Sequence, residues 1–107
     1  MAEVLKINDD QFENEVIECD RLVVVDFGAE WCGPCKKLHP IMAELAEEMA
    51  DKAKIVEVDV GLSPQSAQKH AVISVPQVLF FKEGKVVERI VGVLPKAKLI
   101  EKIDTHI

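Results

Sequence analysis

Residues 22–27 form the most apolar extended segment of the chain, and they constrain the fold more than any other feature. The segment reads Leu-Val-Val-Val-Asp-Phe, with three consecutive β-branched residues. A near-continuous apolar run of this length is typical of a strand that is covered on both faces, as in α/β proteins. The sequence therefore predicts a central strand with helices packed on both sides of the sheet.

Extended and helical patterns alternate along the rest of the chain. The expected strands are 4–7, 22–27, 54–60, 78–81 and 86–91, and the expected helices begin near residues 9, 33, 64 and 95. We expect the last two strands to form a hairpin through a turn at residues 82–85. The order βαβαβαββα predicts one α/β domain over residues 1–107, with a mixed sheet.

Local signals mark the helix boundaries in this prediction. Asn8 is expected to cap the first helix through its side-chain oxygen. Ser63 is expected to cap the third helix, because Pro64 follows it at a position that tolerates proline. Pro40 lies inside the second helix and is expected to kink it, since proline has no backbone donor.

Charge and composition exclude several classes of function. The 107 residues include 13 Lys and Arg against 19 Asp and Glu, which gives a formal net charge of −6. Nucleic acids and anionic membranes are therefore not expected as partners. Residues 1–6 have no basic stretch leading into an apolar one, so no secretory signal is predicted. With only three cysteines, we expect a protein of the reducing cytoplasm.

Cys32 and Cys35 form a C-x-x-C pair between the central strand and the long helix that follows it. Unpaired backbone N–H groups and the helix dipole stabilise an anion at a helix N-terminus, so we expect a lowered pKa for the Cys32 thiol. Lys36 adds a nearby cation, and Gly33 and Pro34 fix the turn. We therefore expect Cys32 to attack a partner disulfide and Cys35, which points inward, to resolve the mixed disulfide.

A metal site is the structural alternative for a C-x-x-C pair, and it needs two further ligands. The remaining candidates are Cys19, His39, His70 and His106, and none has ligand spacing. We therefore predict no metal site. The three histidines are expected to be surface or packing residues, and Cys19 a buried small hydrophobe on the first helix.

Asp26 interrupts the central strand with a carboxylate. A buried carboxylate without a partner has a raised pKa, because burial disfavours its charged form. Such a group, a few residues before Cys35, is a candidate acceptor for the proton of that thiol, directly or through a water. The alternative is that Asp26 lies at an exposed end of the strand, although the apolar run continues into Phe27.

Together these residues resemble the thioredoxin family, and the likeness spans nearly the whole chain. The segment 25–36, Val-Asp-Phe-Gly-Ala-Glu-Trp-Cys-Gly-Pro-Cys-Lys, is similar to the active-site signature of that family. Four further features resemble the family, namely Pro40 and the segments 74–76, 81–85 and 91–96. The resemblance implies the thioredoxin fold, in which four helices flank a central mixed five-stranded sheet.

The resemblance also implies a binding surface around Cys32. In this family the peptide that corresponds to Val75–Pro76 is cis and faces the dithiol, and the residue at Val75 offers its backbone groups to an extended substrate strand. A flat apolar surface would surround the reactive sulfur. The residues that the resemblance assigns to substrate binding are Trp31, Gly33, Pro34, Val60, Val75, Pro76, Gly92 and Val93.

Four positions depart from the family pattern. Gly28 stands where tryptophan is usual, which removes a large side chain behind the active-site loop. Gln77 replaces a common threonine, and His39 replaces a small or apolar residue. Glu57 stands where a lysine is frequent, and we expect it to modulate the site. If Glu57 faces Asp26, the two titrate as a coupled pair and the pKa of Asp26 rises further; alternatively, Glu57 turns to solvent.

The resemblance implies a thiol–disulfide oxidoreductase that reduces protein disulfides and carries electrons through a redox-active Cys32–Cys35 centre. It needs no bound cofactor, because the two sulfurs carry the electrons. The implied partners of this monomer are thioredoxin reductase and disulfide-containing targets, such as peroxiredoxin, methionine sulfoxide reductase or ribonucleotide reductase.

Two other interpretations are an oxidant or isomerase of the secretory pathway and a non-enzymatic interaction module. The missing export signal and the Gly-Pro pair between the cysteines argue against the first. The presence of Asp26 and both cysteines argues against the second.

Overall fold

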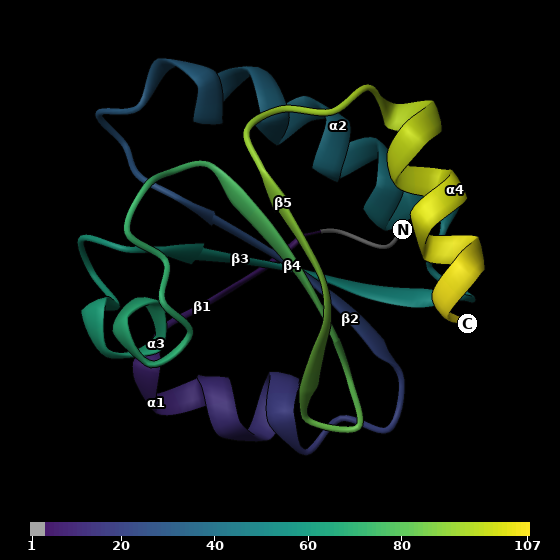
Figure 1. The fold of residues 1–107 in the computed structure, drawn as a ribbon, viewed down its shortest axis with the longest axis horizontal. Helices are drawn as coiled ribbons and strands as arrows, with labels where there is room; N and C mark the ends of the chain where they lie inside the picture. Colours follow the sequence, from purple (N-terminus) through teal and green to yellow (C-terminus); the bar gives the residue numbers. More distant parts are fainter. Residues whose placement is uncertain (1–3) are drawn as a thin grey trace.

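Residues 4–107, which the computed structural model describes, form a five-stranded sheet in the order β1-β3-β2-β4-β5 (Figure 1). The strands are β1 (Leu5–Ile7), β2 (Leu22–Gly28), β3 (Ala53–Asp59), β4 (Gln77–Lys82) and β5 (Lys85–Val91). The helices are α1 (Asp9–Phe12) with the π-helical turn η1 (Glu13–Ile17), α2 (Gly33–Glu48), α3 (Pro64–Lys69) and α4 (Lys96–His106). The expectation about residues 1–6 falls partly on residues 1–3, which lie outside the described range.

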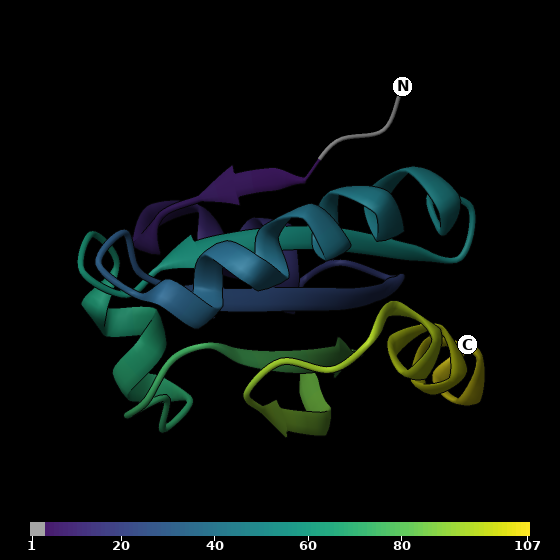
Figure 2. The ribbon, with the colours of Figure 1, turned by 90° about the horizontal axis from the view of Figure 1, so that it is seen from above.

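The sheet is mixed, as the sequence predicts. β1 and β2 both pair with β3 in parallel, whereas β4 runs antiparallel to β2 and to β5. Viewed from above, the five strands follow one another across the sheet with β2 in the middle (Figure 2). The expected α/β architecture and its order of elements are confirmed, and all seven residues of β2 are buried.

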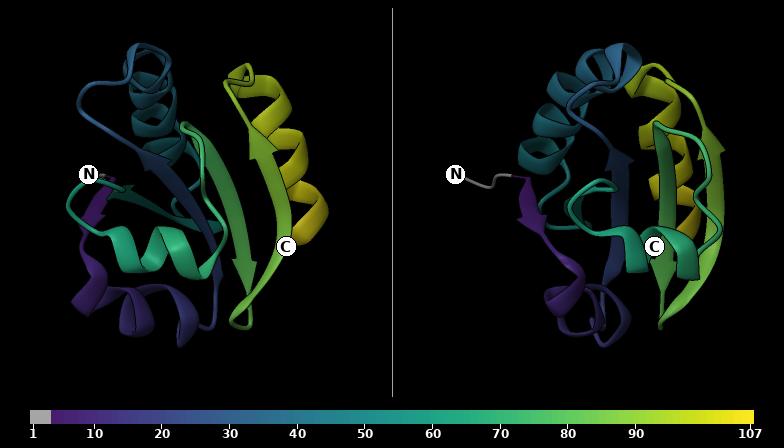
Figure 3. Two further views of the ribbon diagram at one scale, coloured as in Figure 1. Left: turned by 60° about the vertical axis from the view of Figure 1, so that its left-hand side comes forward. Right: turned by 90° about the vertical axis from the view of Figure 1, so that its left-hand side faces the viewer.

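Helices cover both faces of the sheet, with α2 on one side and α1 on the other (Figure 3). The first core lies under α2 and α4 and contains Leu22 and Val24 of β2. The second lies against α1 and α3 and contains Val23, Val25 and Phe27 of the same strand. Successive side chains of a strand point to opposite faces, so β2 supplies one alternate set to each core.

The turn between β4 and β5 consists of Glu83 and Gly84, and both have positive φ values, 53° and 77°. This is the backbone that a two-residue hairpin turn requires. A Cβ atom on Gly84 would lie 3.2 Å from the Ile17 side chain and the Ile17 carbonyl oxygen. Glycine is therefore favoured at position 84, because it adopts a positive φ readily and because a side chain would be too close to Ile17. The predicted hairpin is confirmed.

Ser63 is the N-cap residue of α3, as predicted, but its hydroxyl is not the capping group. Its side chain makes no capping hydrogen bond, and its buried hydroxyl has no partner within residues 4–107. Instead, the Asp9 carboxylate of α1 accepts hydrogen bonds from the backbone N–H groups of Gln65 (3.1 Å) and Ser66 (2.8 Å). The Ser66 hydroxyl also donates to Asp9, at 2.6 Å. The capping group thus comes from a residue 56 and 57 positions away from Gln65 and Ser66 in the sequence.

The first helix is shorter and less regular than expected. Asn8 caps it as predicted, accepting a hydrogen bond from the Asp10 N–H, and Gln11 completes a capping box. Helical structure ends at Ile17, so Cys19 lies beyond it and is half-buried against the second core rather than fully buried. Pro40 lies inside α2. None of the helices in the described range is long and apolar enough to span a membrane.

Candidate functional site

Cys32 and Cys35 lie at the start of α2, where they form a disulfide with their Cα atoms 5.3 Å apart. Cys32 is the N-cap residue, with extended backbone, and its Sγ accepts a hydrogen bond from the Cys35 N–H at 3.2 Å. The sulfur therefore takes the place that a capping oxygen usually occupies at a helix N-terminus. This confirms the predicted position of Cys32 at the electropositive end of the long helix.

Apolar groups pack around the two sulfurs. Both cysteines are buried, and they cluster with Ala29, Val60 and Val75. The Cys32 Sγ lies 3.8 Å from the carbonyl oxygen of Val75. The Val75 peptide thus lies directly against the first sulfur of the pair.

The peptide between Val75 and Pro76 is cis, as the family resemblance implies. Pro76 itself is buried. Its carbonyl oxygen accepts a hydrogen bond from the Gly92 N–H at 2.9 Å. That bond ties the segment after β5 to the loop that touches Cys32.

Several apolar groups near the dithiol are exposed. Trp31, the residue before Cys32, is 77% exposed, and Gly33, Pro34 and Val93 are exposed too. Three large hydrophobic residues that the sequence analysis did not single out are also exposed, namely Leu62, Ile73 and Val91. The sequence could have indicated these residues through their neighbours. Ile73 and Val91 lie within two residues of Val75 and Val93, and Leu62 lies two residues after Val60.

Asp26 lies within β2 and is 4% exposed, so it is an interior residue and not an exposed strand end. No hydrogen-bond donor within residues 4–107 reaches its buried Oδ1 atom. Burial, with a smaller contribution from the Glu57 carboxylate, raises the pKa of Asp26 to about 7. Near neutral pH this side chain is therefore poised to take up and release a proton.

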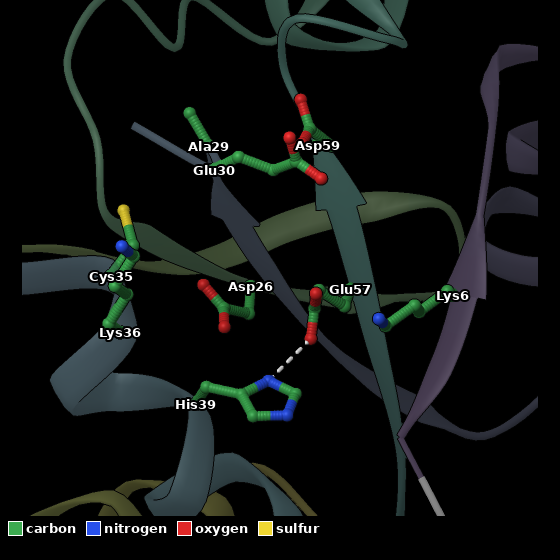
Figure 4. A pocket seen from close by; sticks show the side chains of 9 residues that line it. All are labelled: Lys6, Asp26, Ala29, Glu30, Cys35, Lys36, His39, Glu57 and Asp59. Atoms are coloured by element: carbon green, nitrogen blue, oxygen red, sulfur yellow. Dashed lines mark hydrogen bonds and ion pairs between the residues drawn. The ribbon is translucent and has the colours of Figure 1, made fainter. Parts of the chain in front are cut away.

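A cavity of about 450 Å³ connects the region of Asp26 with that of Cys35 (Figure 4). Its walls come from β1, β2, β3, the start of α2 and the loop after β2. The lining residues are Lys6, Asp26, Ala29, Glu30, Cys35, Lys36, His39, Glu57 and Asp59. In the close-up, the Asp26 carboxyl group lies between Cys35 and Glu57. The cavity is roomy and polar enough to hold a water between carboxylate and thiol.

Glu57 follows the first of the two interpretations that the sequence left open, because it lines the cavity together with Asp26. It contributes to the raised pKa of Asp26, and it also forms an ion pair in which its Oε2 lies 2.9 Å from the His39 Nδ1. His39 is an exposed residue of α2, and its ring nitrogen is in hydrogen-bond contact with the Glu57 carboxylate. His39 is therefore a surface residue, as expected, and it also contacts Glu57.

Gly28 ends β2 directly beneath Cys35. A Cβ atom at this position would lie 3.4 Å from the Cys35 Sγ and 3.5 Å from its Cβ. A side chain at Gly28 would therefore be in van der Waals contact with the second sulfur. Across residues 4–107, no three His, Cys, Asp or Glu side chains are grouped in a way that could hold a metal ion.

Comparison with known proteins agrees with this geometry. A family model described as Thioredoxin matches residues 3–105. The thioredoxin of Haemophilus influenzae is 45% identical over 107 residues, which is 100% of both chains. The thioredoxin of Bacillus subtilis is 43% identical over 97% of this chain and 98% of its own. The chloroplastic M-type thioredoxin of Chlamydomonas reinhardtii is 40% identical over 99% of this chain and 76% of its own.

Proposed function

The chain belongs to the thioredoxin family and is a thiol–disulfide oxidoreductase, and from this premise we propose a role for each residue of the site. The redox-active group is the Cys32–Cys35 pair, which closes a disulfide at the start of α2. Its substrates are disulfide-containing proteins, and a reductase returns the pair to the dithiol. The observation that carries the assignment of roles is the position of Cys32 as the cap of α2.

In the first step, Cys32 acts as the nucleophile. The reduced Cys32 is a thiolate, held by the N-terminal N–H groups of α2 and assisted by the charge of Lys36. Its sulfur attacks one sulfur of the target disulfide, so a bond forms between the two proteins. The target disulfide breaks and its second sulfur leaves as a thiolate.

In the second step, Cys35 resolves the mixed disulfide. The Cys35 proton moves to the Asp26 carboxylate, directly or through a water in the cavity, and the Cys35 sulfur then attacks the Cys32 sulfur. The intermolecular bond breaks and the target leaves as a dithiol once its thiolates take up protons. Two electrons have moved from the cysteine pair to the target, and Asp26 returns its proton to solvent.

The target docks on the apolar surface beside the dithiol. Support comes from the exposure of Trp31 and Val93 and from the contact between Cys32 and the Val75 carbonyl group. An extended target strand would pair with the backbone of Val75 and bring its disulfide to the Cys32 sulfur. The full set proposed to contact targets is Trp31, Gly33, Pro34, Val60, Val75, Pro76, Gly92 and Val93.

Thioredoxin reductase is the proposed electron donor. Peroxiredoxins, methionine sulfoxide reductases and ribonucleotide reductase are proposed targets, because each leaves a disulfide after its own turnover. We place the monomeric protein in the cytoplasm, because a dithiol that donates electrons must be kept reduced between turnovers.

Substitution of the resolving thiol tests the division of roles. Cys35→Ser should form stable mixed disulfides with target proteins, because Cys32 still attacks and nothing resolves the product. The captured complexes are detected by non-reducing electrophoresis, and the linked cysteine is identified by mass spectrometry. Cys19→Ser is the matched control and should leave both trapping and insulin reduction by dithiothreitol unchanged. Linkage through Cys19 would overturn the assignment of the nucleophile.

A further inference from the structure

Asp26 and Glu57 are register partners on the neighbouring parallel strands β2 and β3. Paired residues of parallel strands point to the same face of the sheet, and adjacent strands are about 4.8 Å apart. Both side chains therefore lie on the α2 side of the sheet, where both line the cavity. The charge of Glu57 consequently affects the pKa of Asp26.

The Glu57 carboxylate is in contact with His39. His39 reaches Glu57 from the second turn of α2, and its ring nitrogen lies 2.9 Å from the carboxylate. The His39 side chain is 51% exposed, whereas the Glu57 side chain is 23% exposed. The three residues thus form a series from the buried carboxyl group through a half-buried carboxylate to a ring in contact with solvent (Figure 4).

Other charged groups also face this cavity. Lys6 comes from β1, where it is the register partner of Glu57, Lys36 comes from α2, and Glu30 and Asp59 lie at its other end. Within the described part of the chain, His39 is the one side chain that forms an ion pair with Glu57. His39 is therefore the side chain through which a change on α2 would reach the charge next to Asp26.

We propose that His39 is a positioning residue for the second step, because its contact with Glu57 sets how much of the Glu57 negative charge acts on Asp26. This inference rests on the proposed role of Asp26 as the acceptor of the Cys35 proton. It concerns residues that depart from the family pattern, since His39 and Glu57 stand where other residue types are usual.

The electrostatics have a definite sign. When His39 is protonated, its charge compensates Glu57, so Asp26 ionises more readily and accepts the Cys35 proton at lower pH. When His39 is neutral, the free charge of Glu57 opposes ionisation of Asp26. Burial and the Glu57 charge raise the pKa of Asp26 to about 7. The contact between His39 and Glu57 therefore acts on the second step near neutral pH.

The test compares His39→Gln, which retains a polar group but carries no charge, with Glu57→Gln, which removes the charge itself. His39→Gln should move the pH midpoint of mixed-disulfide resolution upward by about half a unit, less than for a direct ion pair. Glu57→Gln should move the midpoint downward, and the double variant should match Glu57→Gln alone. Stopped-flow measurement of target release and NMR titration of the Asp26 carboxyl carbon provide the two readouts.

His106→Gln is the matched control, because His106 forms a similar pair with Glu88 at 3.1 Å on α4, outside the cavity. It should leave both readouts unchanged. Asp26→Asn, measured in the same assay, separates this inference from the proposed function. If Asp26→Asn slows resolution while His39→Gln leaves the midpoint unmoved, the inference on His39 is overturned alone. An unchanged pH profile in Asp26→Asn would instead overturn the proposed role of Asp26.

Discussion

The two faces of β2 differ in what their side chains meet. On the α1 side, Val23, Val25 and Phe27 are fully buried among apolar groups from one end of the strand to the other. On the α2 side, the strand begins with Leu22 and Val24 in an apolar core but ends with Asp26 and Gly28 beside the cavity.

The difference shows where this domain places its stability and where it places its chemistry. An apolar side chain in place of Asp26 would pack without the desolvation cost of a carboxylate. A side chain in place of Gly28 would cover Cys35. On the α2 face, the last residues of β2 therefore lack the apolar packing that the opposite face has along the whole strand.

The largest expected effect comes from removing a buried side chain on the α1 side of β2. Phe27→Ala should lower the free energy of unfolding by about 3–5 kcal/mol, because it removes a fully buried ring that packs near Phe12. Urea denaturation monitored by circular dichroism measures the loss. Ile73→Ala, at a position that is 96% exposed, is the control and should change stability by less than about 0.5 kcal/mol. A similar loss in both variants would remove the distinction between buried and exposed apolar groups.

Asp26→Asn tests the desolvation cost of the buried carboxylate on the α2 side of β2. The folded protein holds the Asp26 proton up to about pH 7, whereas an unfolded chain releases it near pH 4. The folded state binds the extra proton in this window, so stability falls as the pH rises through it, by up to about 4 kcal/mol. The Asp26→Asn variant should lack this component, and stability measured from pH 4 to 8 should show a flatter curve. Parallel curves for the two proteins would contradict the unpaired burial of Asp26.

Gly28→Ala should have the smallest effect. The added Cβ would make contacts of 3.4 Å and 3.5 Å with Cys35, close to the lower limit of ordinary packing. We expect a gain of about 0.5 kcal/mol from the lower entropy of the unfolded chain. Gly92→Ala is the matched control, because open space surrounds Gly92 but its φ of +96° disfavours a side chain. Gly92→Ala should cost about 1 kcal/mol, and thermal unfolding should separate the two variants.

Patterns within one element predicted much of this structure. The apolar run of β2 indicated a strand with two covered faces, and the interruption at Asp26 indicated a buried carboxylate. The C-x-x-C pair before an amphipathic helix placed Cys32 at the helix N-terminus. These features depend on residues that are close together in the sequence, so local patterns are enough to predict them.

Features that join distant segments were harder to predict. The pairing of His39 with Glu57 depends on the rotation of α2 about its axis and on the register of β3. The capping of α3 by Asp9 depends on how α1 docks, which local capping rules do not describe. Ser63 satisfies those rules by residue type, but its backbone conformation, with ψ of 63°, lies outside the extended region typical of a cap.

The Asp9 cap has a consequence for the side of the molecule that we propose binds targets. Asp9 joins α1 to the start of α3, and the chain leaves α3 toward the loop that carries Ile73 and the cis peptide. The loop from Ile73 to Pro76 is therefore connected, through one short helix, to the carboxylate of Asp9. Destabilising the first helix would consequently affect the proposed target-binding surface without changing any residue of that surface.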